Sequence, residues 1–142
     1  MKEVDLGEGG IALRFERGEE VVEAILAWAK PERRNVAAAS LSGIGALEAV
    51  ELGFFDRDVK RYERVLLPEV HELLTFNGTL ARVGPDPILH AHVTLGARDF
   101  SVRGGHFFRG IVAVTVEIVV QRFPNALRRG PDAATGLNFI QV

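Results

Sequence analysis

The sequence predicts an α+β domain built around a large, mainly antiparallel β-sheet. One stretch near the N-terminus has helical spacing, and six or seven strand-like runs follow residue 35. These runs lie too close together in the sequence for repeated parallel crossovers. At 142 residues, with no repeat, linker or low-complexity tract, we expect a single domain over residues 1–142.

The first predicted elements are a short strand and a helix. Residues 11–15 (IALRF) read as a strand, after a bare turn at residues 7–10 (GEGG). From residue 17 to residue 32 (RGEEVVEAILAWAKPE), apolar side chains recur at helical spacing and acidic residues occupy the first turn. Pro31 stands near the end of this pattern, where a helix is expected to stop.

The middle of the chain is strand-like. The small apolar run at residues 35–41 (NVAAASL) fits a buried strand, and the two glycines of residues 42–46 (SGIGA) predict a turn. Within residues 47–56 and within residues 60–67, apolar and polar side chains alternate. The two runs flank a polar turn, which predicts a β-hairpin.

Further strands are expected after Pro68. Residues 71–83 (HELLTFNGTLARV) form one, with an apolar face made of Leu74, Phe76, Gly78 and Leu80. Two more flank the turn ARD, namely ILHAHVTLG at residues 88–96 and FSVRGGHFF at residues 100–108. Residues 110–123 are the longest β-branched run, and the remainder is turn-rich with a short apolar tail.

Composition limits the function classes. A hydrophobic content of 47% with 25% charged residues is typical of a soluble globular protein, and no stretch is long and apolar enough to predict a membrane span. The absence of cysteine excludes disulfides and thiolate ligands, and the N-terminus lacks a signal-peptide core, so we expect a cytoplasmic protein.

Charge gives no positive support for nucleic-acid binding, because the net charge is −2 and duplex DNA binding usually leaves a basic footprint. A local basic patch remains open in the C-terminal half, which holds Arg103, Arg109, Arg122, Arg128 and Arg129.

Three of the four histidines lie between residues 88 and 108. His90 and His92 are two positions apart in a predicted strand, so their side chains share a face. A three-residue turn at 97–99 would place His90 opposite His106 on that face. A two-residue turn would send His106 to the other face, unless a bulge at Gly104–Gly105 restored it.

Three imidazoles without a fourth protein ligand are typical of an open divalent-metal site, for which zinc is the usual occupant. The candidate ligands are His90, His92 and His106. The alternative is a set of partly exposed histidines on a sheet face, hydrogen-bonded to neighbours or water.

Two carboxylates are weaker candidates. Glu72, next to His71, could orient an imidazole or act as a general base if its strand neighbours the histidine hairpin; otherwise it is a solvated strand end. Glu117 stands among apolar residues and would need a partner such as Arg109 or Arg122 if it faced inward.

Two families resemble parts of the chain. Gly84, His90 and His92 match the opening of the cupin motif, but Gly96 and Ala97 stand where its glutamate is expected, and its second motif is missing. The better resemblance, over most of the chain in order, is to the plants and prokaryotes conserved (PPC) domain family. It is carried by SLSGIGALEAVELGFFD (40–56), HELLTFNGTLA (71–81) and the His-x-His strand with Gly-Gly-His (89–120).

The PPC resemblance implies a seven- or eight-stranded, mostly antiparallel sheet with flanking helices, assembled as a homotrimer. It also implies that His90, His92 and His106 can hold a metal. The family is often designated DNA-binding because its plant members carry AT-hooks; this chain has no Arg-Gly-Arg-Pro stretch that would place arginines in a minor groove.

Three functional hypotheses follow. The first is a trimeric cytoplasmic module that binds a divalent metal and acts as a DNA-binding regulator or through other partners. The second is a metal-dependent hydrolase or small-ligand-binding protein that uses an open three-histidine site, with Glu72 as the candidate base. The third is a structural trimer in which the histidines are polar packing. The phosphate-binding motifs of nucleotide enzymes are absent.

Overall fold

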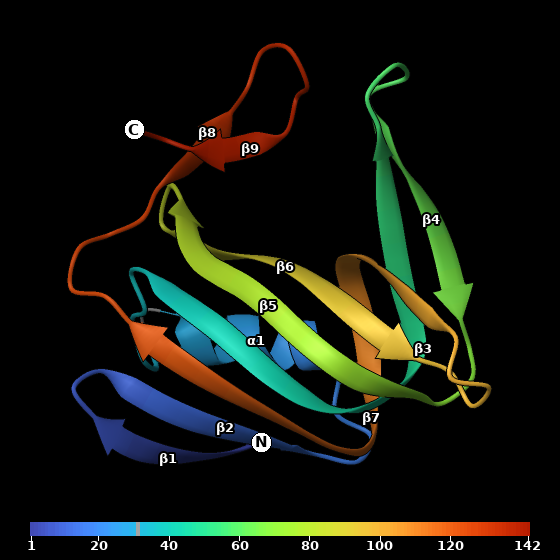
Figure 1. Ribbon diagram of the computed structural model, residues 1–142. Coiled ribbons are helices and arrows are strands. Elements are labelled where there is room, and N and C mark those ends of the chain that lie inside the picture. The colour runs from blue at the N-terminus through green and yellow to red at the C-terminus, as the bar shows by residue number, and fades with distance from the viewer. Residues whose placement is uncertain (31) are drawn as a thin grey trace.

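A curved antiparallel sheet of seven strands dominates the computed structural model, which describes residues 1–30 and 32–142 (Figure 1). Pro31 lies outside the described residues. The strand order is β1-β2-β7-β6-β5-β3-β4, and a two-stranded sheet β8-β9 follows at the C-terminal end. The strands are β1 (Lys2–Gly7), β2 (Gly10–Glu16), β3 (Ala39–Asp56), β4 (Arg61–Leu67), β5 (His71–Val83), β6 (Asp86–Gly96), β7 (Val102–Arg122), β8 (Arg129–Pro131) and β9 (Asn138–Ile140).

The two longest strands close the sheet on itself. β7 pairs with β6 through its first residues and with β2 through its last, and it also pairs with β3 along much of its length. Because β3 and β6 both pair with β5, the strands β7, β6, β5 and β3 form a closed circuit of pairings. The core lies on one side of this sheet, and the outer face carries polar side chains together with exposed apolar ones such as Ile44 and Val119.

The predicted antiparallel sheet of about seven strands is confirmed, but the α+β class with flanking helices is wrong. In the described part of the chain the only helix is α1 (Val21–Ala29), so the fold is mainly β. No helix there is long and apolar enough to cross a membrane.

Helix α1 forms where the sequence predicts it. The side chain of Glu20 caps its first turn by accepting hydrogen bonds from the backbone N–H groups of Val22 and Glu23. Ile25 and Trp28 are completely buried against the sheet. The Trp28 indole donates to Glu3 Oε2 at 2.6 Å, so the buried ring keeps a partner for its polar atom.

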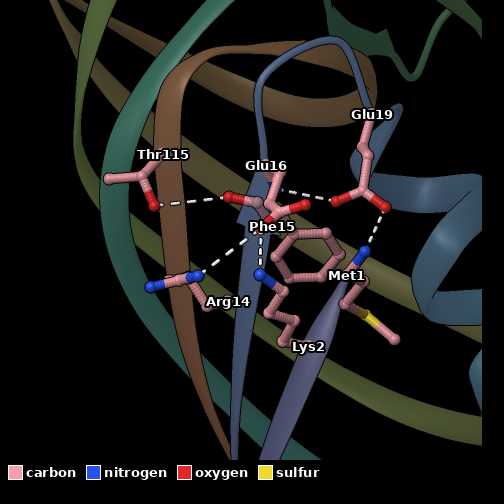
Figure 2. A network of polar contacts seen from close by, with 7 residues as sticks. All are labelled: Met1, Lys2, Arg14, Phe15, Glu16, Glu19 and Thr115. Carbon is pink, nitrogen blue, oxygen red and sulfur yellow. Dashed lines mark hydrogen bonds and ion pairs between the residues drawn. The ribbon is translucent and has the colours of Figure 1, made fainter.

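A polar network ties the N-terminal hairpin to its neighbours (Figure 2). Lys2 Nζ lies 2.7 Å from Glu16 Oε1 across β1 and β2, and the Met1 amino group contacts Glu19 ahead of α1. The Thr115 hydroxyl of β7 donates to the Phe15 carbonyl at 3.3 Å. These contacts connect β1, β2, β7 and the start of α1; the exposed ion pairs among them add little individual stability.

The glycine turn predicted at residues 42–46 is wrong, because β3 runs through these residues as one strand. Glycine is needed there for close approach to β7. A Cβ on Gly43 would lie 2.4 Å from the Glu117 carbonyl oxygen, and one on Gly45 would lie 2.3 Å from that of Thr115. The register of β3 against both β5 and β7 shifts at these glycines, so they bend the strand.

The other predicted strands form, but β3 begins at Ala39 rather than at residue 35, the runs 100–108 and 110–123 belong to the single strand β7, and β1 has no predicted counterpart. The hairpin β3–β4 forms as expected, with Asp56 paired to Arg61. On β5, Phe76 and Leu80 are buried as predicted, whereas Leu74 is 44% exposed and Leu73 is buried instead. The cause is a register shift between Leu73 and Thr75, which moves Leu74 to the outer face.

Replacing Gly43 with alanine should destabilise the fold by about 1–3 kcal/mol, because the new methyl group would overpack the β3–β7 contact. Urea denaturation of Gly43→Ala against wild type measures this change. Gly96→Ala is the matched control, since its Cβ would meet Leu74 at 3.4 Å, an ordinary contact. Equal losses of stability in both variants would contradict the packing argument.

Candidate metal centre

Strands β6 and β7 bring three histidines to one place on the outer face of the sheet. Along β6, Ala91 and Val93 are buried in the core, so the alternating His90 and His92 point the other way. His106 of β7 is paired directly with His92, and its side chain therefore emerges on the same face.

The sequence predicts correctly that His106 shares a sheet face with His90 and His92. The predicted register of β6 against β7 is wrong. Gly96 pairs with Val102 rather than with Phe100, so residues 97–101 form a five-residue connection instead of a three-residue turn. In that connection Asp99 Oδ1 accepts hydrogen bonds from the Ser101 backbone and hydroxyl, at 3.0 and 2.6 Å. The register moves by two residues, which preserves the face and places His92, not His90, opposite His106.

The bulge at Gly104–Gly105, which a two-residue turn would have required, does not form, since both residues pair in continuous register with β6. The glycines instead allow close approach on both sides of β7. A Cβ on Gly104 would lie 2.7 Å from the Val93 carbonyl oxygen of β6, and one on Gly105 would lie 2.9 Å from the Gly53 carbonyl oxygen of β3. Larger residues at these positions would push β6 and β3 away from the strand that carries His106.

The three imidazoles are mutually close. Their ring centroids are 5.2–5.4 Å apart, and one ligand nitrogen from each lies within 4.8 Å of the others. Nitrogens bound to one tetrahedral zinc at about 2.1 Å are about 3.4 Å apart. Rotations of the imidazoles about their side-chain bonds would close this difference, so the residues fit a divalent ion.

Aromatic side chains wall one side of the group. The Tyr62 and Phe108 rings lie 4.8 and 4.6 Å from the His106 ring, centroid to centroid, and the Arg64 guanidinium covers Phe108. The Tyr62 hydroxyl is 3.5 Å from His106 Nδ1. Metal-bound histidines generally hydrogen-bond through their second ring nitrogen, and Tyr62 could take that part for His106.

Burial keeps two of these histidines neutral. Desolvation lowers the pKa of His106 to about 4, with smaller effects of His90, His92 and Arg64. Desolvation, followed by the charges of Arg129 and His92, also lowers the pKa of His90. Because only a neutral imidazole has a free lone pair, both side chains are ready to bind a cation at neutral pH.

The carboxylates named from the sequence lie elsewhere. Glu72 pairs with Gly96 at the far end of β5–β6, four positions along β6 from His92, and is exposed. Glu117 is exposed on the outer face, so it needs no buried partner. In the described part of the chain no carboxylate joins the histidine group.

The fourth histidine also lies away from the group. His71 begins β5, is buried, and contacts the Glu69 carbonyl oxygen through Nδ1 at 2.9 Å. It is paired with Leu47 of β3, beyond Glu72 on β5.

Sequence reasoning treated Arg129 only as part of a basic patch. In the structure it stands beside the histidines, where its charge acts on His90. Arg129 lies in a turn-rich segment after the main sheet. The sequence pattern there does not indicate where this segment packs, because the position of a loop depends on tertiary contacts.

The family model of the Plants and Prokaryotes Conserved (PCC) domain matches residues 6–124. The chain belongs to this family. The abbreviations PPC and PCC name the same family, so the resemblance carried by its strand motifs and the His-x-His and Gly-Gly-His segments is confirmed. No curated protein sequence matches the chain significantly.

Solved structures of the same fold come from bacteria and archaea. A "putative dna binding protein" from Bacteroides thetaiotaomicron is 25% identical with a TM-score of 0.93, over 99% of this chain and 96% of that one. A PPC protein from Pyrococcus horikoshii is 28% identical, with a TM-score of 0.85 over 94% and 91% of the two chains. A metal-containing protein from Archaeoglobus fulgidus is 31% identical, with a TM-score of 0.85 over the full length of both.

The stability of the metal-free protein should fall as the pH is lowered from about 6.5 towards 4. Unfolded histidine binds a proton near 6.5, whereas folded His106 does so only at about 4, so acid favours the unfolded chain in this window. We expect a loss of about 1–2 kcal/mol from this group, after allowing for solvent screening.

Urea denaturation with a chelator, at about pH 7 and about pH 4.5, measures the effect. Since His106→Gln removes the titrating group, this variant should lose less stability than wild type between the two conditions. An equal loss in both proteins would contradict the assignment.

Proposed function

We propose that this chain is a single-domain, metal-binding member of the PPC family, in which His90, His92 and His106 hold one divalent cation. The observation that carries the proposal is the convergence of three ligand nitrogens within 4.8 Å on the outer face of β6 and β7. The description of the Archaeoglobus fulgidus protein as metal-containing supports it from a relative 31% identical.

Zinc is the ion we favour. Three neutral imidazoles and no thiolate or carboxylate suit a borderline-soft cation better than magnesium or calcium, which prefer oxygen ligands. Three protein ligands also leave a coordination position for water or a small ligand, as in open zinc sites.

The purified, untagged protein should bind about one zinc ion per chain, and His92→Ala should weaken the affinity by about 100-fold or more because one of three ligands is lost. Elemental analysis gives the stoichiometry, and competition with a chromophoric chelator gives the affinity. His71→Asn is the matched control, because it removes a histidine outside the group and should leave the affinity unchanged.

Absence of stoichiometric metal, or wild-type affinity in His92→Ala, would contradict the proposal. The histidines would then be polar packing on the sheet face.

Small-ligand binding at the open position is the alternative that the geometry favours over hydrolysis. A hydrolase would need a base beside the ion, and Glu72, the candidate from the sequence, stands at the far end of β5–β6. The Arg129 side chain beside the histidines is suited to holding a ligand rather than to accepting a proton.

DNA binding is a second candidate, which rests on the printed name of the Bacteroides thetaiotaomicron protein. A net charge of −2 gives it no electrostatic support in this chain. Retardation of duplex DNA that weakens steeply with salt would favour a regulatory role, and no retardation at low salt would remove it. A cysteine-free chain suits the cytoplasm for either function.

We further propose a homotrimer, as expected for the family. Exposed apolar side chains on the outer face support self-association, because Val4, Ile44, Leu74 and Val119 line one groove there.

Light scattering should give a mass of three 15.5 kDa chains. Val119→Asp should dissociate the assembly, because it places a charge on this face. Val59→Asp, in the β3–β4 turn, is a control at a similarly exposed valine, at 55% against 49%. A monomeric wild type, or equal dissociation in both variants, would contradict the assignment of the interface.

A further inference from the structure

A cavity of about 200 Å³ lies between the histidines and the C-terminal hairpin β8–β9. β6 and β7 supply His90 and His106 to its floor, and the hairpin region supplies Arg129, Leu137 and Phe139 to its roof. Figure 1 shows this hairpin, in red, beside the C-terminal end of β5. The cavity therefore adjoins two of the three candidate ligands, His90 and His106.

The roof is attached to the main sheet. The backbone N–H of Arg82 donates to the Leu127 carbonyl oxygen at 2.8 Å, and Arg82 forms a β-bridge with Arg128. These contacts hold the chain that leads into β8 against β5. The roof residues follow position 124, where the match to the family model ends, so the cavity combines histidines inside the matched region with a segment beyond it.

Arg129 is the charged group of the roof, and the protein uses only part of its hydrogen-bonding capacity. One terminal nitrogen donates to the Asn138 carbonyl oxygen at 3.0 Å, and the other to the Thr79 hydroxyl at 3.3 Å. Its buried Nε–H has no acceptor in the described part of the chain. A guanidinium carries five N–H donors, so donors remain for a ligand.

The charge of Arg129 is also without a counter-ion at this site. The described residues that line the cavity include no aspartate or glutamate, and the ion pairs of the described chain do not include Arg129. A divalent cation on three neutral imidazoles would add two further positive charges. Partly buried charges of one sign require compensation, so an anion is the fitting ligand.

Most of the remaining wall is apolar, with Tyr62 and Asn138 as its polar members, and the space is small. Ile88 and Leu89 lie on the sheet side, and Leu137 and Phe139 on the hairpin side. At about 200 Å³ the cavity is smaller than the roughly 300–1,000 Å³ typical of sites for drug-sized ligands. The cavity thus suits a compact apolar body attached to an anionic head.

We propose that this cavity binds a small monocarboxylate with a short branched or cyclic hydrocarbon body, its carboxylate held by Arg129 and facing the three-histidine centre. The part of the inference that concerns the metal rests on the proposed function; the part that concerns Arg129 and the apolar walls does not. The carboxylate would occupy the open coordination position, and the apolar side chains of the hairpin would contact the hydrocarbon group of the ligand.

Isothermal titration of the full chain, zinc-loaded and metal-free, with isovalerate, isovaleramide and inorganic phosphate tests the proposal. Isovaleramide has the same hydrocarbon group as isovalerate but no charge. Phosphate is an anion without a hydrocarbon group. We expect isovalerate to bind the zinc-loaded protein at least about tenfold more tightly than either probe, because charge and burial both contribute.

Arg129→Met should weaken isovalerate binding at least about tenfold and leave zinc stoichiometry unchanged. Arg129→Lys retains the charge but loses the planar guanidinium that can donate two hydrogen bonds to one carboxylate. It should give an intermediate loss of isovalerate affinity if the variant folds as wild type. Arg128→Met is the matched control, because Arg128 is the exposed neighbour and should not affect the affinity. Thermal melts confirm that each variant is folded.

Equal binding of acid and amide, tighter binding of phosphate, or wild-type affinity in folded Arg129→Met would overturn this inference while the metal site stands. Failure to bind zinc would instead overturn the proposed function. The metal-free titration would then decide the Arg129 pocket on its own: a tenfold preference for the acid that Arg129→Met abolishes supports it, and no preference overturns it.

Discussion

The pairing of β6 with the first residues of β7 is the constraint on which the rest of the site depends. It sets His92 opposite His106, and the period of two along β6 adds His90 on the same face. A slip of one residue would turn His106 into the core and bring Phe107 out, which would lose both the core contact and the imidazole group. Core packing therefore fixes the register, and the grouping of the three histidines is a consequence of it.

Long strands make this arrangement possible in a small domain. β7 extends from the histidine hairpin to the N-terminal strands and pairs with β6, β3 and β2 in turn. Glycines occupy the positions where neighbouring strands approach most closely. Gly104 packs against the backbone of β6, Gly105 against that of β3, and Gly43 of β3 against that of β7. The Gly-Gly-His run thus combines close packing with a candidate ligand, since the glycines allow the strand that carries the histidine to lie close to both neighbours.

Local patterns predicted the features that depend on periodicity alone. The shared face of His90 and His92 follows from strand alternation, and α1 from helical spacing with acidic residues in the first turn. Features that depend on contacts between distant residues were beyond such patterns. The five-residue connection at 97–101 depends on Asp99–Ser101 hydrogen bonds, and the glycines of residues 42–46 are explained only by the approach of β7. Arg129 reaches the histidines because β8 docks on β5, which no periodicity in the turn-rich tail could indicate.

The central claim is that three imidazoles from two paired strands share one ion. X-ray absorption at the zinc K-edge, on untagged protein loaded with one equivalent of zinc, tests it directly. We expect nitrogen neighbours at about 2.0–2.1 Å with the outer-shell scattering of three imidazole rings. A spectrum with one imidazole or none, and a first shell of water oxygens, would contradict it.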